Sequence, residues 1–250
     1  MRKKIKLLSV ILCIFTLTGC NKSSQKELTI SVATSLSDPI NKIIEEYEKE
    51  NNVKVNVNYG GSGTLKNQIS NGADACVFFS ANEKFMNELI DENMVKEEDV
   101  TVPISNSLVL IKSNKCEYDI KTLEDILKYD ATLAIGQTDT VPAGQYAKES
   151  LKKLGIFNKI EKDLIYGKDV SAVKNYVETS EVDLGIVYKS DTLDLKNSEV
   201  VLEIPENTHE KINYTLSSIN GNEDGKKIIE FINSKSSKEI LKEYGFLINE

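Results

Sequence analysis

The stretch LTISVATSLSDPINKIIEEYEKENNVKVNVNY, residues 28–59, has the pattern of a strand–helix–strand unit, and this unit indicates the fold class. Residues 28–33 are rich in strand-forming residues, residues 39–51 have a helical pattern that starts at a proline, and residues 53–59 return to a strand pattern. A strand, a helix and a second strand in this order predict two parallel strands joined by a crossover helix. The stretch therefore predicts an α/β protein.

The same alternation continues along the chain. Further strands are expected at residues 77–79, 107–111, 132–135, 183–188 and 212–219, and helices at about 64–71, 82–93, 122–129, 142–154, 170–180 and 224–244. Strands separated by helices imply parallel layers, and their number exceeds what one compact sheet of this length would hold. Because no proline- or glycine-rich linker divides the chain, we expect two α/β lobes with the chain crossing between them.

The first twenty residues have the pattern of an export signal. Four basic residues within the first six positions precede the apolar run Leu7–Leu17, which is shorter than the roughly 20 residues of a membrane span. The run ends in Leu-Thr-Gly-Cys20, which resembles a bacterial lipobox. That resemblance implies a signal peptide over residues 1–19, a lipid on the Cys20 sulfur and a short tether over residues 20–27. The alternative is an ordinary secretory signal with an incidental cysteine.

The charge of the chain argues against nucleic acid as a partner. Removing residues 1–19 takes away four of the 31 basic residues and none of the 39 acidic ones, which leaves a net charge of −12. A protein this acidic repels a polyanion. Once Cys20 is assigned to lipid, only Cys76 and Cys116 remain for a disulfide, and their spacing does not show whether they pair. The fold cannot depend on a disulfide framework.

Composition also excludes several kinds of site. The single histidine, His209, lies in a polar stretch with no second histidine or cysteine nearby, so a zinc site or a hydrolytic triad is not expected. Arg2 is the only arginine and belongs to the signal segment. The mature chain therefore lacks the guanidinium that usually grips a carboxylate ligand.

Four helix starts combine glycine, proline and capping residues in a way that suits an anion. They are Ser35–Pro39, where the proline is expected at the first helical position, Gly60–Thr64, Thr140–Gly144 and Gly167–Val170, where Asp169 is the expected cap. Each helix start offers free backbone N–H groups and the positive end of a helix dipole. In open α/β sheets such turns gather beyond the carboxyl ends of the strands, where ligands bind. The pattern predicts an anion site made of neutral donors.

Three segments of the sequence resemble one family. Residues 141–150 (VPAGQYAKES), 184–191 (LGIVYKSD) and 243–246 (EYGF) are similar to the molybdate-binding proteins of ABC importers, and the likeness extends over residues 28–250. The resemblance implies two α/β lobes with a ligand cleft between them, in the fold of periplasmic binding proteins. The first lobe would comprise residues 28–105 and 212–250, and the second residues 106–211.

The resemblance also implies a ligand and the residues that bind it. The expected oxyanion shell is Ala33, Ser35, Ser62, Ala81, Ala143, Val170 and Tyr188. The two serines and the tyrosine would donate hydroxyl groups and the others chiefly backbone N–H groups. Molybdate or tungstate has only acceptors, so such a shell satisfies it, whereas hydrogen phosphate would leave a proton unpaired and sulfate is too small. The two metal oxyanions are too alike for the sequence to choose between them.

Further expectations follow from the same resemblance. The protein would be a monomer without catalytic activity or cofactor, with no direct protein ligand to a metal, held at the outer face of the cell membrane by Cys20 and delivering its ligand to an ABC-importer permease. One departure from the family pattern is Cys76 and Asn82 at positions that usually carry acids, which puts the local packing around Ala81 in doubt. The alternatives are a binding protein for sulfate, phosphonate or a small organic anion, and an enzyme or adhesin on the same scaffold.

Overall fold

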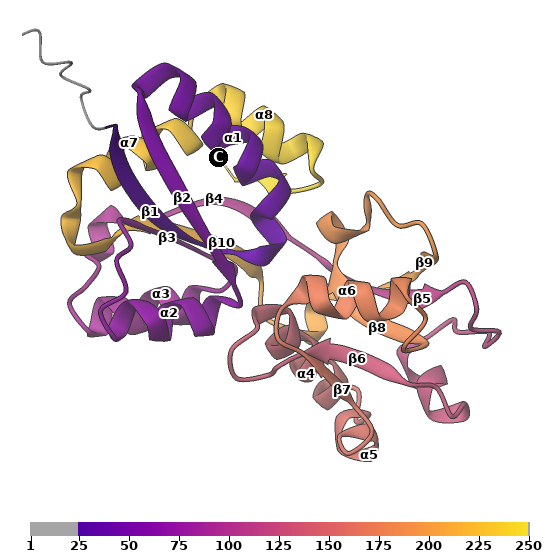
Figure 1. Ribbon diagram of the computed structural model, residues 1–250. Helices are drawn as coiled ribbons and strands as arrows, with labels where there is room; N and C mark the ends of the chain where they lie inside the picture. The colour runs from indigo at the N-terminus through magenta and orange to yellow at the C-terminus, as the bar shows by residue number, and fades with distance from the viewer. Residues whose placement is uncertain (1–24, 250) are drawn as a thin grey trace, which may run out of the picture.

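The computed structural model describes residues 25–249, which form two α/β lobes, each built on its own sheet (Figure 1). The expected signal peptide and Cys20 lie outside the described residues. Most of the tether expected over residues 20–27 also lies outside the described residues, and its last two residues, Lys26 and Glu27, belong to the first strand. Within residues 25–249, no helix combines the length and the apolar character needed to cross a membrane.

The first lobe contains a six-stranded sheet in the order β11-β4-β10-β3-β1-β2. Helices α1, α7 and α8 lie over one face of this sheet, and α2 and α3 over the other (Figure 1). The strands are β1 (Lys26–Ala33), β2 (Val53–Gly60), β3 (Val77–Ser80), β4 (Thr101–Asn106), β10 (Ile212–Ser218) and β11 (Leu247–Ile248). The helices are α1 (Ser37–Asn51), α2 (Ser62–Ser70), α3 (Glu83–Asp91), α7 (Glu223–Ile232) and α8 (Lys235–Glu243).

The second lobe contains a five-stranded sheet in the order β7-β6-β8-β5-β9, against which α4 and α6 pack. The strands are β5 (Leu108–Ser113), β6 (Leu133–Gly136), β7 (Ile165–Gly167), β8 (Leu184–Tyr188) and β9 (Ser198–Glu203). The helices are α4 (Pro142–Lys153), α5 (Phe157–Ile160) and α6 (Val170–Glu178). Short 3-10 turns η1 (Thr34–Leu36), η3 (Leu123–Lys128) and η4 (Lys189–Thr192) complete the part used below.

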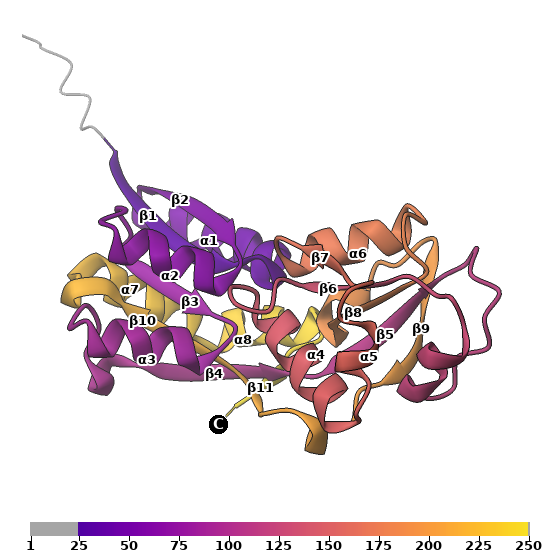
Figure 2. The same ribbon diagram turned by 90° about the horizontal axis from the view of Figure 1, so that it is seen from below.

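Within the described residues, the chain passes twice between the lobes. The first crossing runs from β4 directly into β5, with Ser107 alone between them, and the two strands follow one another from lobe to lobe in Figure 2. The second crossing, residues 204–211, leads from β9 to β10. Two connections between strands therefore join the lobes. Away from these connections the lobes can move toward each other and close a cleft.

Several sequence expectations about the elements were wrong. The strands are not all parallel, because β10 runs antiparallel to β3 and β4, and β5 runs antiparallel to β8 and β9. Strands β4, β7, β9 and β11 were not predicted. Residues 122–129 form the 3-10 turn η3 rather than an α-helix. The helix expected over residues 224–244 is divided in two, because Ser234 caps α8 by accepting a hydrogen bond from the Ser237 N–H.

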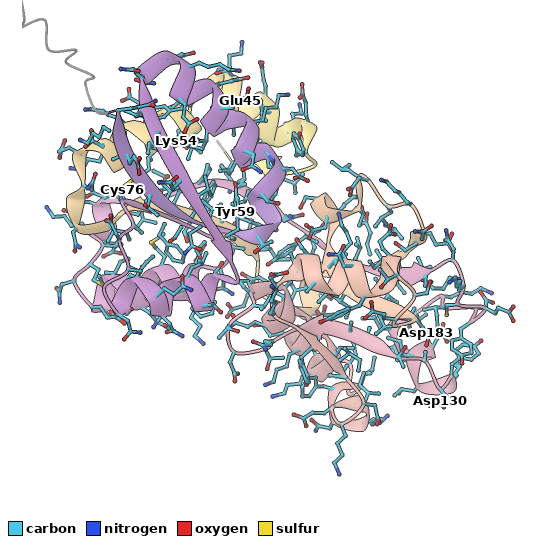
Figure 3. The ribbon with its side chains drawn as sticks, in the orientation of Figure 1. Glu45, Lys54, Tyr59, Cys76, Asp130 and Asp183 are labelled. Atoms are coloured by element: carbon cyan, nitrogen blue, oxygen red, sulfur yellow. The ribbon has the colours of Figure 1, made fainter. Side chains whose placement is uncertain are left out.

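The two cysteines of the described chain do not pair. Cys76 lies in the first lobe, just before β3 (Figure 3). Cys116 follows β5 in the second lobe, and both cysteines are free and buried. The Cys76 N–H donates to the Thr29 carbonyl at 2.8 Å, which extends the pairing of this segment with β1. Burial raises the pKa of the Cys76 thiol to about 11, so the side chain is a protonated core group rather than a nucleophile.

Candidate functional site

All seven residues of the expected oxyanion shell line one cavity between the lobes. The loops that form it follow β1, β2 and β3 in the first lobe and β6, β7 and β8 in the second. The complete lining is Ala33, Thr34, Ser35, Gly60, Gly61, Ser62, Ala81, Val141, Pro142, Ala143, Asp169, Val170 and Tyr188. These loops come together because each follows the carboxyl end of a strand.

The cavity is small. Only about 10 Å³ is open to the centre of a water molecule, which is roughly the least that holds one water. A larger groove, of about 650 Å³, runs along α8 and β11 and shares no residue with the six loops. In this closed arrangement the cavity therefore favours a compact ion over an amino acid, a peptide or a sugar.

Three helices point their amino ends at the cavity. The first residues of α2, α4 and α6 are Ser62, Pro142 and Val170, and neither α2 nor α4 has a side-chain cap. On α6 the Asp169 carboxylate accepts the Ala172 N–H at 2.8 Å, as the sequence predicted, which leaves the Val170 N–H without a partner inside the helix. Pro142 is at the first helical position, also as predicted. Backbone N–H groups and helix dipoles thus converge on the cavity.

The start of α1 differs from the prediction. The turn η1 precedes α1, which begins at Ser37 with Leu36 as its N-cap and without a side-chain cap. Pro39 is therefore the third residue of the helix rather than the first. At this side of the cavity the donor is therefore the Ser35 hydroxyl in η1, and the start of α1 itself does not line the cavity.

Both serine hydroxyls accept or share a hydrogen bond from behind the cavity. Ser62 Oγ accepts the Ala81 N–H at 3.0 Å, and Ser35 Oγ lies 2.9 Å from the hydroxyl of Tyr214 on β10. The Ala81 N–H, expected to face a ligand, therefore already has a partner. With its oxygen occupied in this way, the Ser62 hydroxyl keeps its own proton for an acceptor inside the cavity.

Two buried hydroxyls at the cavity have no hydrogen-bond partner in the described chain. They belong to Tyr188, at the end of β8, and to Thr34, in η1. Leaving such a group unpaired costs about 1–3 kcal/mol, which a bound acceptor would recover. Burial raises the pKa of the Tyr188 phenol well above its ordinary value, so this group stays protonated and acts as a donor.

Asp169 is the one charged residue in the described lining, which contains no lysine. Its Oδ1 atom is engaged with the start of α6. An anion here would be held by neutral donors and helix dipoles, as the sequence predicted, and a shell of donors suits an ion that has only acceptors.

Direct contacts close the cavity across the lobes. The Gly63 N–H donates to the Thr140 carbonyl at 2.9 Å, and Asn82 Nδ2 donates to Gln145 Oε1 at 3.1 Å. A Cβ atom on Gly61 would lie 2.9 Å from the Thr140 carbonyl oxygen, so the lobes meet too closely there for a side chain. Asn82 also caps α3, since its Oδ1 accepts the Lys84 N–H at 2.8 Å. The replacement of an acid by Asn82 is thus accommodated by a cap and a contact between lobes.

The sequence did not point to every residue of the site. Thr34 lies between two predicted residues, Ala33 and Ser35, and its hydroxyl was a signal that could have been used. Gly61 belonged to a recognised glycine-rich loop. Tyr214 gave no local signal, because it reaches Ser35 from a strand 179 residues further along the chain.

The sequence pattern of bacterial extracellular solute-binding proteins matches residues 28–247. The chain belongs to this family. It is 35% identical to the Bacillus subtilis (strain 168) protein named "Putative ABC transporter substrate-binding lipoprotein YvgL", with 98% of this chain and 99% of that protein covered. It is 32% identical to the molybdate-binding protein ModA of Escherichia coli (strain K12), with 99% of each covered.

A solved structure agrees with these relatives. The substrate-binding domain of a putative molybdenum ABC transporter from Clostridium difficile is 37% identical to this chain and superposes with a TM-score of 0.67, over 90% of this chain and all of that one. The predicted two-lobed α/β fold of solute-binding proteins is confirmed. The family is one of solute-binding proteins and not of enzymes.

Proposed function

We propose that this protein binds molybdate or tungstate outside the cytoplasm and delivers the ion to the permease of an ABC importer. The observation that carries the proposal is the small cavity at six strand ends, which is lined mainly by neutral donors and favours a compact ion in the closed arrangement. A relative at 32% identity is named a molybdate-binding protein. The same donors explain why no arginine is needed: the shell supplies hydrogen bonds and dipoles to an ion that has only acceptors.

The ligand shell in this proposal has contributions from both lobes. Ser35 and Ser62 donate hydroxyl protons from the first lobe, and Ala143 and Val170 donate backbone N–H groups from the second. Tyr188 adds its phenol, which has no other partner in the described chain. Ala33 lines the cavity, and Ala81 supports Ser62 through its N–H. In this proposal the protein is a monomer that catalyses no reaction, needs no cofactor and gives the metal no direct ligand.

Calorimetry on the purified protein tests the ligand. Molybdate and tungstate should each bind at one site per chain, and competition between them gives the preference. Sulfate, phosphate and a phosphonate, the alternative ligands, should raise the melting temperature less than molybdate at equal concentration. Stronger stabilisation by sulfate or by a phosphonate would replace molybdate by that ion in the proposal.

We further propose that residues 1–19 are a signal peptide and that a lipid on Cys20 holds the protein at the outer face of the membrane. The support is the Leu-Thr-Gly-Cys20 sequence and the word lipoprotein in the name of the Bacillus subtilis relative. Cys20→Ser should leave the precursor uncleaved or release the protein into the medium. A variant processed and retained at the membrane like the unaltered protein would refute the anchor.

A further inference from the structure

A series of hydrogen bonds, buried at Asn106 and Tyr214, leads from the crossing between the lobes to the ligand cavity. Its members are Asn106 at the end of β4, Tyr214 on β10 and Ser35 in η1. Asn106 Nδ2 lies 3.3 Å from Tyr214 Oη, and Tyr214 Oη lies 2.9 Å from Ser35 Oγ. The Asn106 amide also reaches across to the second lobe, where Nδ2 donates to Ser190 Oγ at 2.8 Å.

The direction of the two Asn106 bonds follows from one fixed donor, the N–H group of Ser107. The Ser107 N–H, which can only donate, lies 2.9 Å from the Asn106 side-chain oxygen. This contact fixes the amide, so that Nδ2 faces Ser190 and Tyr214 and uses its two protons on their oxygens. Tyr214 Oη therefore accepts from Asn106, which leaves the Tyr214 proton available for Ser35 Oγ at 2.9 Å.

Tyr214 keeps that proton under all ordinary conditions. Its side chain is fully buried, and burial raises the pKa of the phenol above its usual range. Its ring is fixed by neighbours on two sides, with centroid distances of 5.4 Å to Phe246 and 5.9 Å to Tyr188. The phenol oxygen therefore has little freedom to turn away from Ser35.

We infer that Tyr214 is a positioning residue that fixes the Ser35 hydroxyl as a donor toward the cavity. Because Ser35 Oγ accepts the Tyr214 proton, the Ser35 proton is directed to a ligand oxygen. The Ala81 N–H has the same relation to Ser62 Oγ, so both serines present protons to the cavity. A ligand oxygen that carries a proton would place that proton against the serine protons, where it finds no acceptor. The inference rests on the proposed function, and it assigns part of the selection for fully deprotonated oxyanions to Tyr214.

A double-mutant cycle with molybdate as the probe tests the inference. Tyr214→Phe should weaken binding by about two- to tenfold, the worth of one orienting hydrogen bond. In a Ser35→Ala background the same substitution should change affinity by less than about twofold, because Tyr214 acts through Ser35. A Tyr214 that serves only packing would cost the same affinity in both backgrounds, and that additive result would overturn the inference.

A second variant covers the case in which Tyr214→Phe fails to fold. Asn106→Ala removes the donor to Tyr214 together with the bonds to Ser190 and from the Ser107 N–H. Ser190→Ala controls for the bond to the second lobe, which is the one bond that it removes, and the Ser35→Ala background controls for the rest. Asn106→Ala should weaken molybdate binding more than Ser190→Ala does, and the excess should vanish with Ser35→Ala. An equal loss in the two variants would overturn the inference. If the unaltered protein bound no molybdate, the proposed function itself would fail.

Discussion

Removal of the Tyr188 hydroxyl separates a ligand-binding role from a structural one. The Tyr188 side chain is 1% exposed at the end of β8, and its oxygen has no partner in the described chain. Tyr188→Phe therefore breaks no hydrogen bond within the protein. Leu184, Ile186 and Val187 are fully buried along the same strand and should hold the ring in place. The melting temperature of the ligand-free variant should stay the same or rise slightly, because an unpaired buried hydroxyl is removed.

The affinity for molybdate should change much more than the stability. A hydrogen bond to a charged group is worth about 1.5–3 kcal/mol, so loss of the phenol should weaken binding about ten- to a hundredfold. Calorimetric titration gives the affinity, and thermal melting of the ligand-free protein gives the stability. Tyr47→Phe is a matched control, because Tyr47 is also buried, packs against Phe231 at a centroid distance of 5.2 Å and does not line the cavity. This variant should bind molybdate normally.

Two outcomes would refute the reasoning about Tyr188. If the variant bound molybdate as tightly as the unaltered protein, the phenol would not be part of the ligand shell. If instead the ligand-free variant melted at a lower temperature with its affinity preserved, Tyr188 would be a core or lobe-interface tyrosine. Affinity and melting temperature are measured independently, so a variant that loses both is recognised as such.

Three further predictions concern the lobes and pH. Gly61→Ala should weaken molybdate binding roughly five- to a hundredfold and leave the melting temperature of the ligand-free protein unchanged, because the three atoms nearest to the added Cβ belong to the second lobe and overpacking costs about 1–3 kcal/mol. Full affinity by calorimetry would contradict this. Small-angle scattering should show compaction when molybdate is added, and none would count against closure between the lobes. Burial raises the pKa of Asp191 to about 7 from an ordinary 3.8, so the folded state holds an extra proton between these values and stability should fall as pH rises through about 7. Asp191→Asn should lack this loss in melts at pH 5 and pH 8, and parallel curves for the two proteins would refute it.

The features that local sequence could predict are those whose causes are local. Pro142 at the start of α4 and the Asp169 cap of α6 follow from residue types at fixed offsets, and both are present as expected. The division between α7 and α8 also had a local cause, the capping serine Ser234, but the amphipathic pattern continues through it. The helical hydrophobic period was assessed over all of residues 224–244, and a shorter segment around Ser234 would have indicated the N-cap.

The features that could not be predicted depend on distant partners. Strand direction is an example, because β10 runs antiparallel to β3 although their sequences carry no mark of direction. The edge strands β7 and β9 were missed since they are short or half-exposed and lack the buried pattern of a central strand. Tyr214 is a third case. Its role depends on Ser35 and Asn106, and these three residues lie on three separate segments of the chain.

Neutral donors hold a dianion well only when water is kept away from them. In water each N–H or O–H group competes with solvent, whereas in a closed site of lower dielectric every charge–dipole contact is stronger. The cavity has room for about one water centre, and the bonds from Gly63 to Thr140 and from Asn82 to Gln145 hold it shut. Donors from one lobe alone would face solvent on the other side. The strength of the proposed site is therefore a property of the closed pair of lobes, and a variant that holds the lobes apart should lose affinity even with every donor in place.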